Sequence, residues 1–393
     1  METPAEDRRT SLGELARLFL KLGTIGFGGP AAHIALMEDE VVRRRNWLTR
    51  EAFLDYVGAT NLIPGPNSTE LAIEIGRDRA GWPGLVVAGA SFIVPAALIV
   101  GVIAAAYVRF GQLPAMVALL DGVKPVVIAI VVQALWRLGR TAVKTMWLAT
   151  LAAVSIAAVV AGVHELVVLL ASAGISVLIA MRTRAVTTRG AELTVLPGAP
   201  WRVPAGAAAL GAGVTAPAVA LWPLFGIFLK IGSVLFGSGY VLLAFLRADF
   251  VQRLGWLTER QLLDAVAVGQ VTPGPVFTTA TFIGYVLAGP LGAMVATVGI
   301  FLPAFIFVAL SGPFIPRLRR SRIAGAALDG VNAASFALMA LVTWQLARAA
   351  IVDLPTALLA LGSGALLATR RVNAAWLILG GGIAGVALAA LHG

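Results

Sequence analysis

Long apolar stretches limit this chain to folds that are built in a lipid bilayer. Its windows with few or no charged residues include Gly84–Val108, Ala115–Trp136, Met146–Val163, Leu166–Met181, Gly292–Ser311, Ile323–Leu346 and Ala374–Leu391. A helix needs about 20 apolar residues to cross about 30 Å of hydrocarbon, and these windows have that length. Only 13% of the residues are charged, whereas soluble domains carry about 25%. The sequence therefore predicts an all-α polytopic membrane protein.

Several function classes lack the residues they need. The chain has no cysteine, which excludes disulfides and thiolate metal sites. Its formal net charge of +10 comes largely from arginines in short loops between apolar segments, which indicates membrane topology rather than nucleic-acid binding. Its three histidines are scattered, and no metal-binding or nucleotide-binding motif is present. We expect no cofactor, no metal and no nucleic-acid partner.

The sequence is an internal duplication. "FLKLGTIGFGG" (Phe19–Gly29) matches "FLKIGSVLFGS" (Phe228–Ser238) at an offset of 209 residues, and Pro64-Gly65-Pro66 matches Pro273-Gly274-Pro275 at the same offset. After a one-residue slip the matches continue, with Asp121 corresponding to Asp329. We predict an N-terminal repeat at residues 1–181, a linker at 182–221 and a C-terminal repeat at 222–393.

Loop charge predicts that the two repeats have opposite orientations. In the first repeat the loop at 137–144 is basic and the loop near 109–114 is much less so. In the second repeat it is the loop at 316–322 that is basic. Basic loops favour the cytoplasmic side, so the pattern indicates an inverted repeat, a common plan among secondary transporters. An extra span in the linker, at residues 203–222, would bring the total to about thirteen hydrophobic segments. We expect a cytoplasmic N-terminus and an external C-terminus.

Four helix breaks interrupt these apolar repeats. They lie at Gly26–Pro30, Pro64–Pro66, Phe236–Gly239 and Pro273–Pro275. Irregular backbone at membrane depth requires burial in protein or a water-filled cavity, and the start of a helix offers free N–H groups to an anion. The alternative is that these breaks only turn helical hairpins. We predict an anion site formed by the breaks and their polar neighbours: Phe27, Gly28, Gly29, Pro30, Asn61, Pro64, Gly65, Pro66, Asn67, Ser68, Thr69, Gly237, Ser238, Gln270, Pro273, Gly274, Pro275, Thr278 and Thr279.

Charged residues near the breaks extend the hypothesis. Lys21 and Lys230 occupy equivalent apolar positions, and two lysines from inverted halves can neutralise a divalent anion. The alternative is that each ammonium extends to the membrane surface. Glu70 is the candidate for proton coupling, because a carboxylate in a protein pocket can carry a proton. Asp55 and Asp264 are expected to form capping or ion-pair contacts, and the run at 38–45 to form a surface connector.

Three motifs carry a family resemblance. The first repeat contains "FLKLGTIGFGGP", "NWLTREAFLD" and "NLIPGPNSTELAIEIG", and the second contains "FLKIGSVLFGSG", "GWLTERQLLD" and "GQVTPGPVFTTATFIG". Together these motifs resemble the chromate ion transporter family in its long, two-domain form. The family's signature positions here are Phe27, Gly28, Gly29, Pro30, Pro64, Gly65, Pro66, Pro273, Gly274 and Pro275. The second repeat departs from the first at Ser238-Gly239 and at Gln270, so symmetric ligand roles are in doubt.

The resemblance implies a multi-pass plasma-membrane protein of bacteria or archaea. Its implied activity is export of chromate, a tetrahedral dianion similar to sulfate, driven by the proton gradient or the membrane potential. Transport of sulfate or molybdate, a passive anion channel and an intramembrane enzyme stay open as alternatives. The expected partners are a small oxyanion and the lipid bilayer, with a homodimer as a further option.

Overall fold

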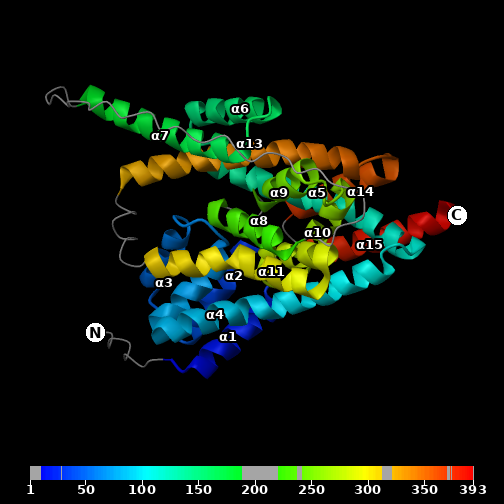
Figure 1. The fold of residues 1–393 in the computed structure, drawn as a ribbon, viewed down its shortest axis with the longest axis horizontal. Coiled ribbons are helices and arrows are strands. Elements are labelled where there is room, and N and C mark those ends of the chain that lie inside the picture. The colour runs from blue at the N-terminus through cyan, green and yellow to red at the C-terminus, as the bar shows by residue number, and fades with distance from the viewer. Residues whose placement is uncertain are drawn as a thin grey trace.

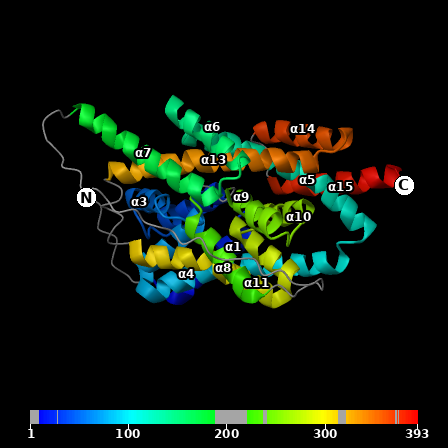
Figure 2. The same cartoon turned by 45° about the horizontal axis from the view of Figure 1, so that its top comes forward.

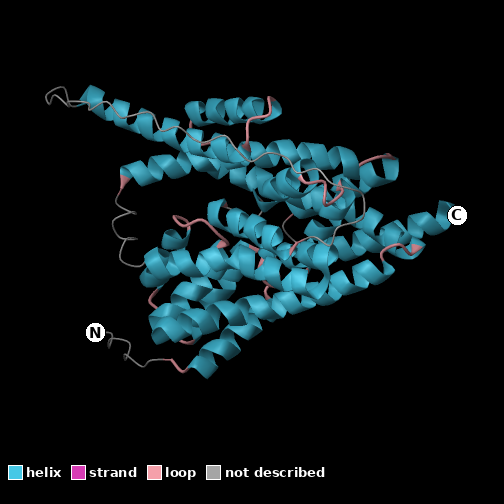
Figure 3. Cartoon of the chain, in the orientation of Figure 1, coloured by secondary structure: helices cyan, strands magenta, loops and turns pink. Residues whose placement is uncertain are grey.

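The computed structural model describes residues 10–27, 29–187, 220–236, 241–311, 321–369, 372 and 374–392. These residues form helices and contain no strand (Figure 3). In lipid a helix satisfies its backbone hydrogen bonds within one segment, which is why apolar sequence of this length becomes helical. Among the described residues, six helices are long and apolar enough to cross a membrane, and three shorter apolar helices accompany them. The prediction of an all-α polytopic membrane protein is confirmed.

The helices occur in the same order in both halves of the chain. The first half contains α1 (Leu12–Ile25), α2 (Pro30–Glu38), the π-helix η1 (Asp39–Arg44), α3 (Arg50–Thr60), α4 (Asn67–Phe110), α5 (Pro114–Ala142), α6 (Met146–Val160) and α7 (Glu165–Thr187). The second contains α8 (Leu221–Val234), α9 (Leu242–Leu246), the π-helix η3 (Arg247–Arg253), α10 (Glu259–Val271), the short 3₁₀ helix η4 (Val276–Thr278), α11 (Thr279–Ser311), α13 (Arg322–Ala350), α14 (Leu354–Ala368) and α15 (Ala374–His392).

Equivalent local signals begin equivalent helices. The Thr49 hydroxyl accepts a hydrogen bond from the Ala52 N–H at the start of α3. Thr258 does the same for Gln261 at the start of α10, and the Gln261 side chain completes a capping box. An N-terminal hydroxyl of this kind satisfies one of the free N–H groups of the first turn. Both caps lie in the repeated sequence Trp-Leu-Thr, at 47–49 and 256–258.

α4 and α11 are not straight helices but hairpins, a feature that the sequence analysis missed. The backbone leaves the helical region at Ala80–Gly81 and again at Ala288–Gly289, where both glycines have φ near +64° (64° and 63°). The first arm of α4 (residues 67–79) then packs against its second arm (residues 82–110). A Cβ on Gly76 would lie 2.3 Å from the carbonyl oxygen of Gly84, so the two arms touch through their backbones.

The two halves run in opposite directions. In Figure 1 the second arm of α4 ends in cyan on the right, whereas the second arm of α11 ends in yellow on the left. α5 and α13 are likewise antiparallel, and α13 begins at the left and α5 at the right (Figures 1 and 2). The arrangement agrees with the inverted repeat that loop charge predicted.

The halves also exchange helices. α6 and α7 of the first half pack on α13, and α14 and α15 of the second half pack on α5 (Figure 2). Glycine allows the closest approaches: a Cβ on Gly122 of α5 would lie 2.1 Å from the carbonyl oxygen of Gly381 in α15. Each half therefore completes the packing of the other.

The surface of the long helices is apolar. The exposed side chains include Leu98 and Val102 of α4, Leu310 of α11 and Trp344 of α13. Contiguous exposed apolar surface is rare on soluble monomers, and here it matches a bilayer-facing belt. Most of the predicted extra span, residues 203–219, lies outside the described residues, as do Gly28, Gly237 and Ser238 of the predicted site.

Candidate functional site

The four predicted breaks meet in two matched pairs. The N–H of Gly65 donates to the carbonyl oxygen of Leu235 at 2.7 Å, and the N–H of Gly274 donates to the carbonyl oxygen of Gly26 at 2.8 Å. Leu235 corresponds to Gly26 in the repeat, and Gly274 to Gly65. Each Pro-Gly-Pro turn is thus bonded to the break between the first two helices of the opposite half, so all four breaks lie at the interface of the halves.

Both turns require glycine for space as well as for backbone conformation. Gly65 has φ +143° and Gly274 has φ +87°, a region that L side chains rarely adopt. A Cβ on Gly65 would lie 2.3 Å from Oε1 of Glu70, and one on Gly274 would lie 2.5 Å from Cβ of Ala96. The carboxyl group of Glu70 therefore packs directly against the first Pro-Gly-Pro turn.

Unsatisfied polar atoms are concentrated in the first turn of α4. Oδ1 of Asn67, Oγ1 of Thr69 and both carboxyl oxygens of Glu70 are buried and accept or donate no hydrogen bond. They are four of the eight such side-chain atoms among the described residues. Leaving one buried polar atom unpaired costs about 1–3 kcal/mol. A turn that keeps four of them together destabilises the fold unless water, a proton or a ligand satisfies them.

The same turn reaches the surface through two asparagines. Nδ2 of Asn67 donates to Oδ1 of Asn61 at 2.5 Å, and Nδ2 of Asn61 donates to the carbonyl oxygen of Val57 at 2.9 Å. Asn61 is exposed and Asn67 is partly exposed, whereas Ser68, Thr69 and Glu70 are buried. A polar route therefore leads from the surface of the chain to the unsatisfied atoms.

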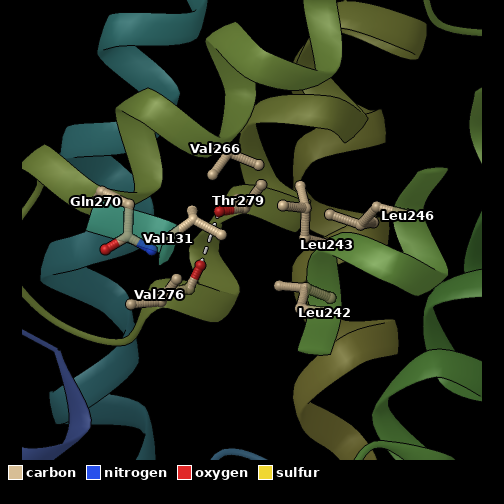
Figure 4. Close-up of a pocket in the computed structure, with 8 residues that line it drawn as sticks. All are labelled: Val131, Leu242, Leu243, Leu246, Val266, Gln270, Val276 and Thr279. Atoms are coloured by element: carbon tan, nitrogen blue, oxygen red, sulfur yellow. Dashed lines mark hydrogen bonds between the residues drawn. The ribbon is translucent and has the colours of Figure 1, made fainter. Parts of the chain in front are cut away.

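The equivalent turn in the second half is satisfied locally. Each of its threonine hydroxyls donates to a backbone carbonyl at 2.8 Å: Thr272 to Val268, Thr278 to Pro275 and Thr279 to Val276. Thr279 occupies the position of Glu70 and lines a cavity of about 10 Å³ with Gln270 and the leucines of α9 (Figure 4). That is room for about one water molecule, so no tetrahedral oxyanion fits there in this conformation. The sequence placed both turns in one predicted anion site and already showed that they are not equivalent; in the structure their chemistry differs.

His33 is a site residue that the sequence analysis did not assign. It is buried in α2, and its Nε2 lies 2.8 Å from the carbonyl oxygen of Gly26, the same oxygen that accepts from Gly274. Its Nδ1 lies 3.3 Å from Oγ of Ser68. One imidazole therefore contacts the first break and the turn after the second. The signal in the sequence was a lone histidine three residues after Pro30, in a repeat whose second copy has Leu242.

The two predicted lysines form ion pairs instead of facing a shared ligand. Nζ of Lys21 lies 2.6 Å from Oε1 of Glu40, and Nζ of Lys230 lies 2.5 Å from Oδ2 of Asp249. Glu40 and Asp249 are equivalent positions in the repeat. The hydrogen bond from Lys21 holds the pKa of Glu40 below its usual value. Each lysine charge is thus balanced by an acid of its own half, and the geometry gives no support to a two-lysine clamp.

Glu40 also corrects the expectation for the run at 38–45. The run was predicted to be a surface connector, but it forms η1, and Glu40 is buried within it. Burial follows from charge balance, because Lys21, Arg44 and Arg45 all lie within 4 Å of its carboxylate. Without these cations a buried carboxylate would be strongly unfavourable.

The other predicted acids have structural partners. Asp264 is buried, accepts from the Tyr107 hydroxyl at 2.9 Å and lies 3.6 Å from Lys124. Lys124 donates to Asp121 at 2.8 Å, and Lys144 pairs with Asp329 at 2.9 Å. The ion-pair role expected for Asp264 is confirmed. Among the described residues, no three histidine, aspartate or glutamate side chains come together as a metal site.

Comparison with known proteins identifies the family. The family model described as Chromate transporter matches residues 13–177 and, a second time, residues 222–386. The chain belongs to the chromate transporter family. The two matches show the same duplication that the sequence and the helix order show. No solved structure gives a significant match.

Three relatives in this family cover most of the chain. The chain is 33% identical to the chromate transport protein of Cupriavidus metallidurans, over 97% of this chain and 94% of that protein. It is 32% identical to a probable chromate transport protein of Synechococcus elongatus, over 89% and 88%. It is 31% identical to the chromate transport protein of Pseudomonas aeruginosa, over 95% and 92%. The protein is thus a multi-pass membrane protein whose relatives are named for transport.

Proposed function

We propose that this protein is a secondary transporter that exports chromate, or a similar tetrahedral oxyanion such as sulfate, across the plasma membrane. The observation that carries the proposal is the turn after Pro64-Gly65-Pro66, at the interface of two inverted halves, where the Thr69 hydroxyl and the Glu70 carboxyl group are buried without a hydrogen-bond partner. The Thr69 hydroxyl, and the Glu70 carboxyl group when it is protonated, can donate to an anion. The names of the relatives, which refer to chromate transport, support the choice of substrate.

The first turn of α4 has the donors that an oxyanion needs. The N–H groups of a first helical turn carry partial positive charge and point outward along the axis. Glu70 and Thr69 use theirs on the carbonyl oxygen of Pro66, which leaves those of Asn67 and Ser68 as candidate donors. The hydroxyls of Ser68 and Thr69 lie in the same turn. Tetrahedral anions commonly bind at helix N-termini of this kind.

Transport needs the site to open to each side in turn. In this conformation Ser68, Thr69 and Glu70 are buried, whereas Asn67 and Asn61 reach the surface. The hydrogen bonds from Gly65 to Leu235 and from Gly274 to Gly26 join the two halves. Inverted repeats alternate access when one half rocks against the other around a fixed site. Such a movement would change the hydrogen bonds between the halves and open the turn to one side of the membrane at a time.

Glu70 supplies the coupling to protons. A carboxylate and a dianion in one buried turn repel each other strongly, because charges interact more strongly away from water. Protonation of Glu70 removes that repulsion, so a bound proton and a bound oxyanion favour each other and move together. One dianion with one proton carries a net charge of −1. An inside-negative membrane potential drives such a charge outward, by about 2.3 kcal/mol per 100 mV.

The test is transport by the purified protein in proteoliposomes. Efflux of labelled chromate and of labelled sulfate is measured while a potassium gradient with valinomycin sets the potential and the pH is set separately. We expect an inside-negative potential to accelerate efflux of chromate. If neither anion moves under any potential, the proposed function is wrong; if sulfate moves and chromate does not, the substrate is wrong.

Glu70→Gln separates the coupling from the transport. The amide cannot titrate, so efflux should lose most of its pH dependence when it is measured above the pH at which chromate itself takes up a proton. Under the same conditions it should carry a charge of −2 per anion in place of −1. Glu74→Gln, one turn further along the same helix, is the matched control and should behave like the natural protein. Retention of the full pH dependence in Glu70→Gln would contradict proton coupling through Glu70.

A further inference from the structure

His33 has a single neutral hydrogen-bonding arrangement that fits its neighbours. The carbonyl oxygen of Gly26 can only accept, so Nε2 must carry the hydrogen that spans their 2.8 Å separation. In a neutral ring Nδ1 is then an acceptor, and the hydroxyl of Ser68 must be the donor across 3.3 Å. The neutral imidazole therefore holds the Ser68 hydrogen on itself and away from any ligand at the start of α4.

The fold does not require an imidazole at this position. The equivalent residue in the second half is Leu242, and α9 packs there without a polar side chain. The residue equivalent to Ser68 is Phe277, so both members of the His33–Ser68 pair are confined to the first half. This is the half whose turn also has the unsatisfied atoms of Asn67, Thr69 and Glu70.

The groups in contact with the ring are neutral. Besides Gly26 and Ser68, the ring of Phe92 meets it edge-on with 5.4 Å between ring centroids. The ionisable side chains on the elements that pack against α2 include Lys21 of α1, Glu40 of η1, Asp55 and Tyr56 of α3, and Glu70 and Glu74 of α4. Lys21 and Glu40 bond to each other. Glu70 is two residues beyond Ser68, in the same buried turn.

We propose that His33 is a positioning residue that controls whether the Ser68 hydroxyl can donate to the bound oxyanion. When His33 gains a proton, Nδ1 becomes a donor and Ser68 accepts from it, so the hydroxyl hydrogen turns to another acceptor. The oxyanion at the first turn of α4 is that acceptor, and the imidazolium adds a positive charge beside it. The inference rests on the proposed function, because it needs an oxyanion at this turn.

Two substitutions separate this role from a merely structural one. In His33→Asn the amide oxygen lies near the position of Nδ1, so it keeps accepting from Ser68 and the hydroxyl stays withheld. In His33→Gln the amide nitrogen lies near the position of Nε2, so it keeps the bond to Gly26 and frees Ser68. A structural role predicts losses in both variants. The proposal predicts changes in opposite directions.

The experiment measures the Kd of labelled chromate for the purified protein between pH 5.5 and 8.5, in the Glu70→Gln background that removes the other titrating group of the turn. Because chromate itself takes up a proton in this range, each Kd is expressed per chromate dianion, with the protonated fraction of the free ligand subtracted. We expect the Kd to rise with pH in that background, by up to about tenfold per pH unit while His33 titrates. Adding His33→Asn should fix the Kd near its high-pH value, and adding His33→Gln should give a lower Kd at pH 8.5 than the background. Both His33 substitutions should abolish the pH dependence of the Kd.

The outcomes distinguish the two proposals. Failure of the natural protein to bind chromate or sulfate at any pH would overturn the proposed function. Binding whose pH dependence survives in both His33 variants, or Kd values that shift in the same direction in both, would overturn the role of His33 and leave the proposed function standing.

A spectroscopic measurement covers the case in which a variant does not fold. The chain has three histidines, so His164→Asn with His392→Asn leaves His33 alone in ¹⁵N-histidine-labelled protein. Without chromate at pH 8 we expect the neutral Nε2–H tautomer, and on adding chromate at the same pH a shift toward imidazolium. The Nδ1–H tautomer, or a spectrum that chromate leaves unchanged, would contradict the proposal.

Discussion

Gly65 has no room for a methyl group. Its Cβ would lie 2.3 Å from Oε1 of Glu70, at a φ of +143°. We expect Gly65→Ala to push the Glu70 carboxyl group away from the turn and to weaken the bond to Leu235, at a cost of about 1–3 kcal/mol for overpacking. The melting temperature, followed by the fluorescence of the nine tryptophans, should fall, and the rate of chromate transport should fall with it.

The control for this substitution is Gly101→Ala on the second arm of α4. A Cβ there meets nothing within 4 Å, and alanine is a better helix former than glycine by about 0.5–1 kcal/mol. The melting temperature of Gly101→Ala should equal or exceed that of the natural protein. Equal melting temperatures for Gly65→Ala and the natural protein would show that the turn is looser than its geometry indicates.

The lysine ion pairs make a second prediction at the residue scale. Lys21→Met removes the closest cation of Glu40, whereas Arg45 keeps its contact at 3.3 Å. The pKa of Glu40 is lowered in the folded protein from its usual 4.5. The pair therefore stabilises the fold above about pH 4.5, and this contribution is lost as the pH falls through the folded-state pKa. Lys21→Met should melt lower than the natural protein at pH 7, by an amount that shrinks below pH 4.5.

Transport kinetics decide between the ion pair and the two-lysine clamp. If the ion pair is the role of Lys21, the apparent KM for chromate should stay within about twofold of the natural value, and Arg43→Met, a weakly paired surface residue, serves as the control. A KM that rises tenfold with no change in melting would support the clamp. The sequence showed both lysines but not their partners, because glutamate in one half and aspartate in the other hid the equivalence of Glu40 and Asp249.

At the scale of elements, the hairpins of α4 and α11 were not predicted. Apolar sequence continues through both reversals, so composition gave one long helix where the backbone makes two arms. The local signal was present in "RAGWPG" and "LAGPLG" at equivalent places, with a glycine of positive φ in each. Small residues on both sides of the turn, Gly76 with Gly84 and Gly284 with Gly292, let the arms touch.

Cross-linking tests the hairpin directly, since the chain has no cysteine of its own. The hydroxyls of Thr281 and Thr297 lie 2.7 Å apart across the arms of α11. In a straight helix, residues 16 apart are separated by about 24 Å. We expect Thr281→Cys with Thr297→Cys to form a disulfide under mild oxidation. Met294→Cys with Leu310→Cys has the same spacing within one arm and should form none, and absence of a cross-link in the first pair would contradict the hairpin.

At the scale of the whole molecule, the duplication and the antiparallel halves followed from the sequence, but the exchange of helices between the halves did not. Repeated motifs and loop charge predict two copies of opposite direction. They contain no information on the exchange of α6 and α7 for α14 and α15, because that depends on which apolar faces meet in three dimensions. The chemical difference between the two Pro-Gly-Pro turns was partly visible in the sequence, because Glu70 in the first half corresponds to Thr279 in the second. The boundaries at 181 and 222 stay predictions.

Opposite orientation of the halves relative to the membrane is the remaining prediction at this scale. Arg43 of η1 and Gln252 of η3 are equivalent and exposed. If the repeat is inverted in the membrane, single cysteines at these two positions face opposite sides. In intact cells a membrane-impermeant maleimide should label Gln252→Cys and spare Arg43→Cys, and everted vesicles should reverse the result. Labelling of both from one side would mean that the antiparallel helices do not cross the bilayer as their lengths indicate, and alternating access between the Pro-Gly-Pro turns would lose its basis.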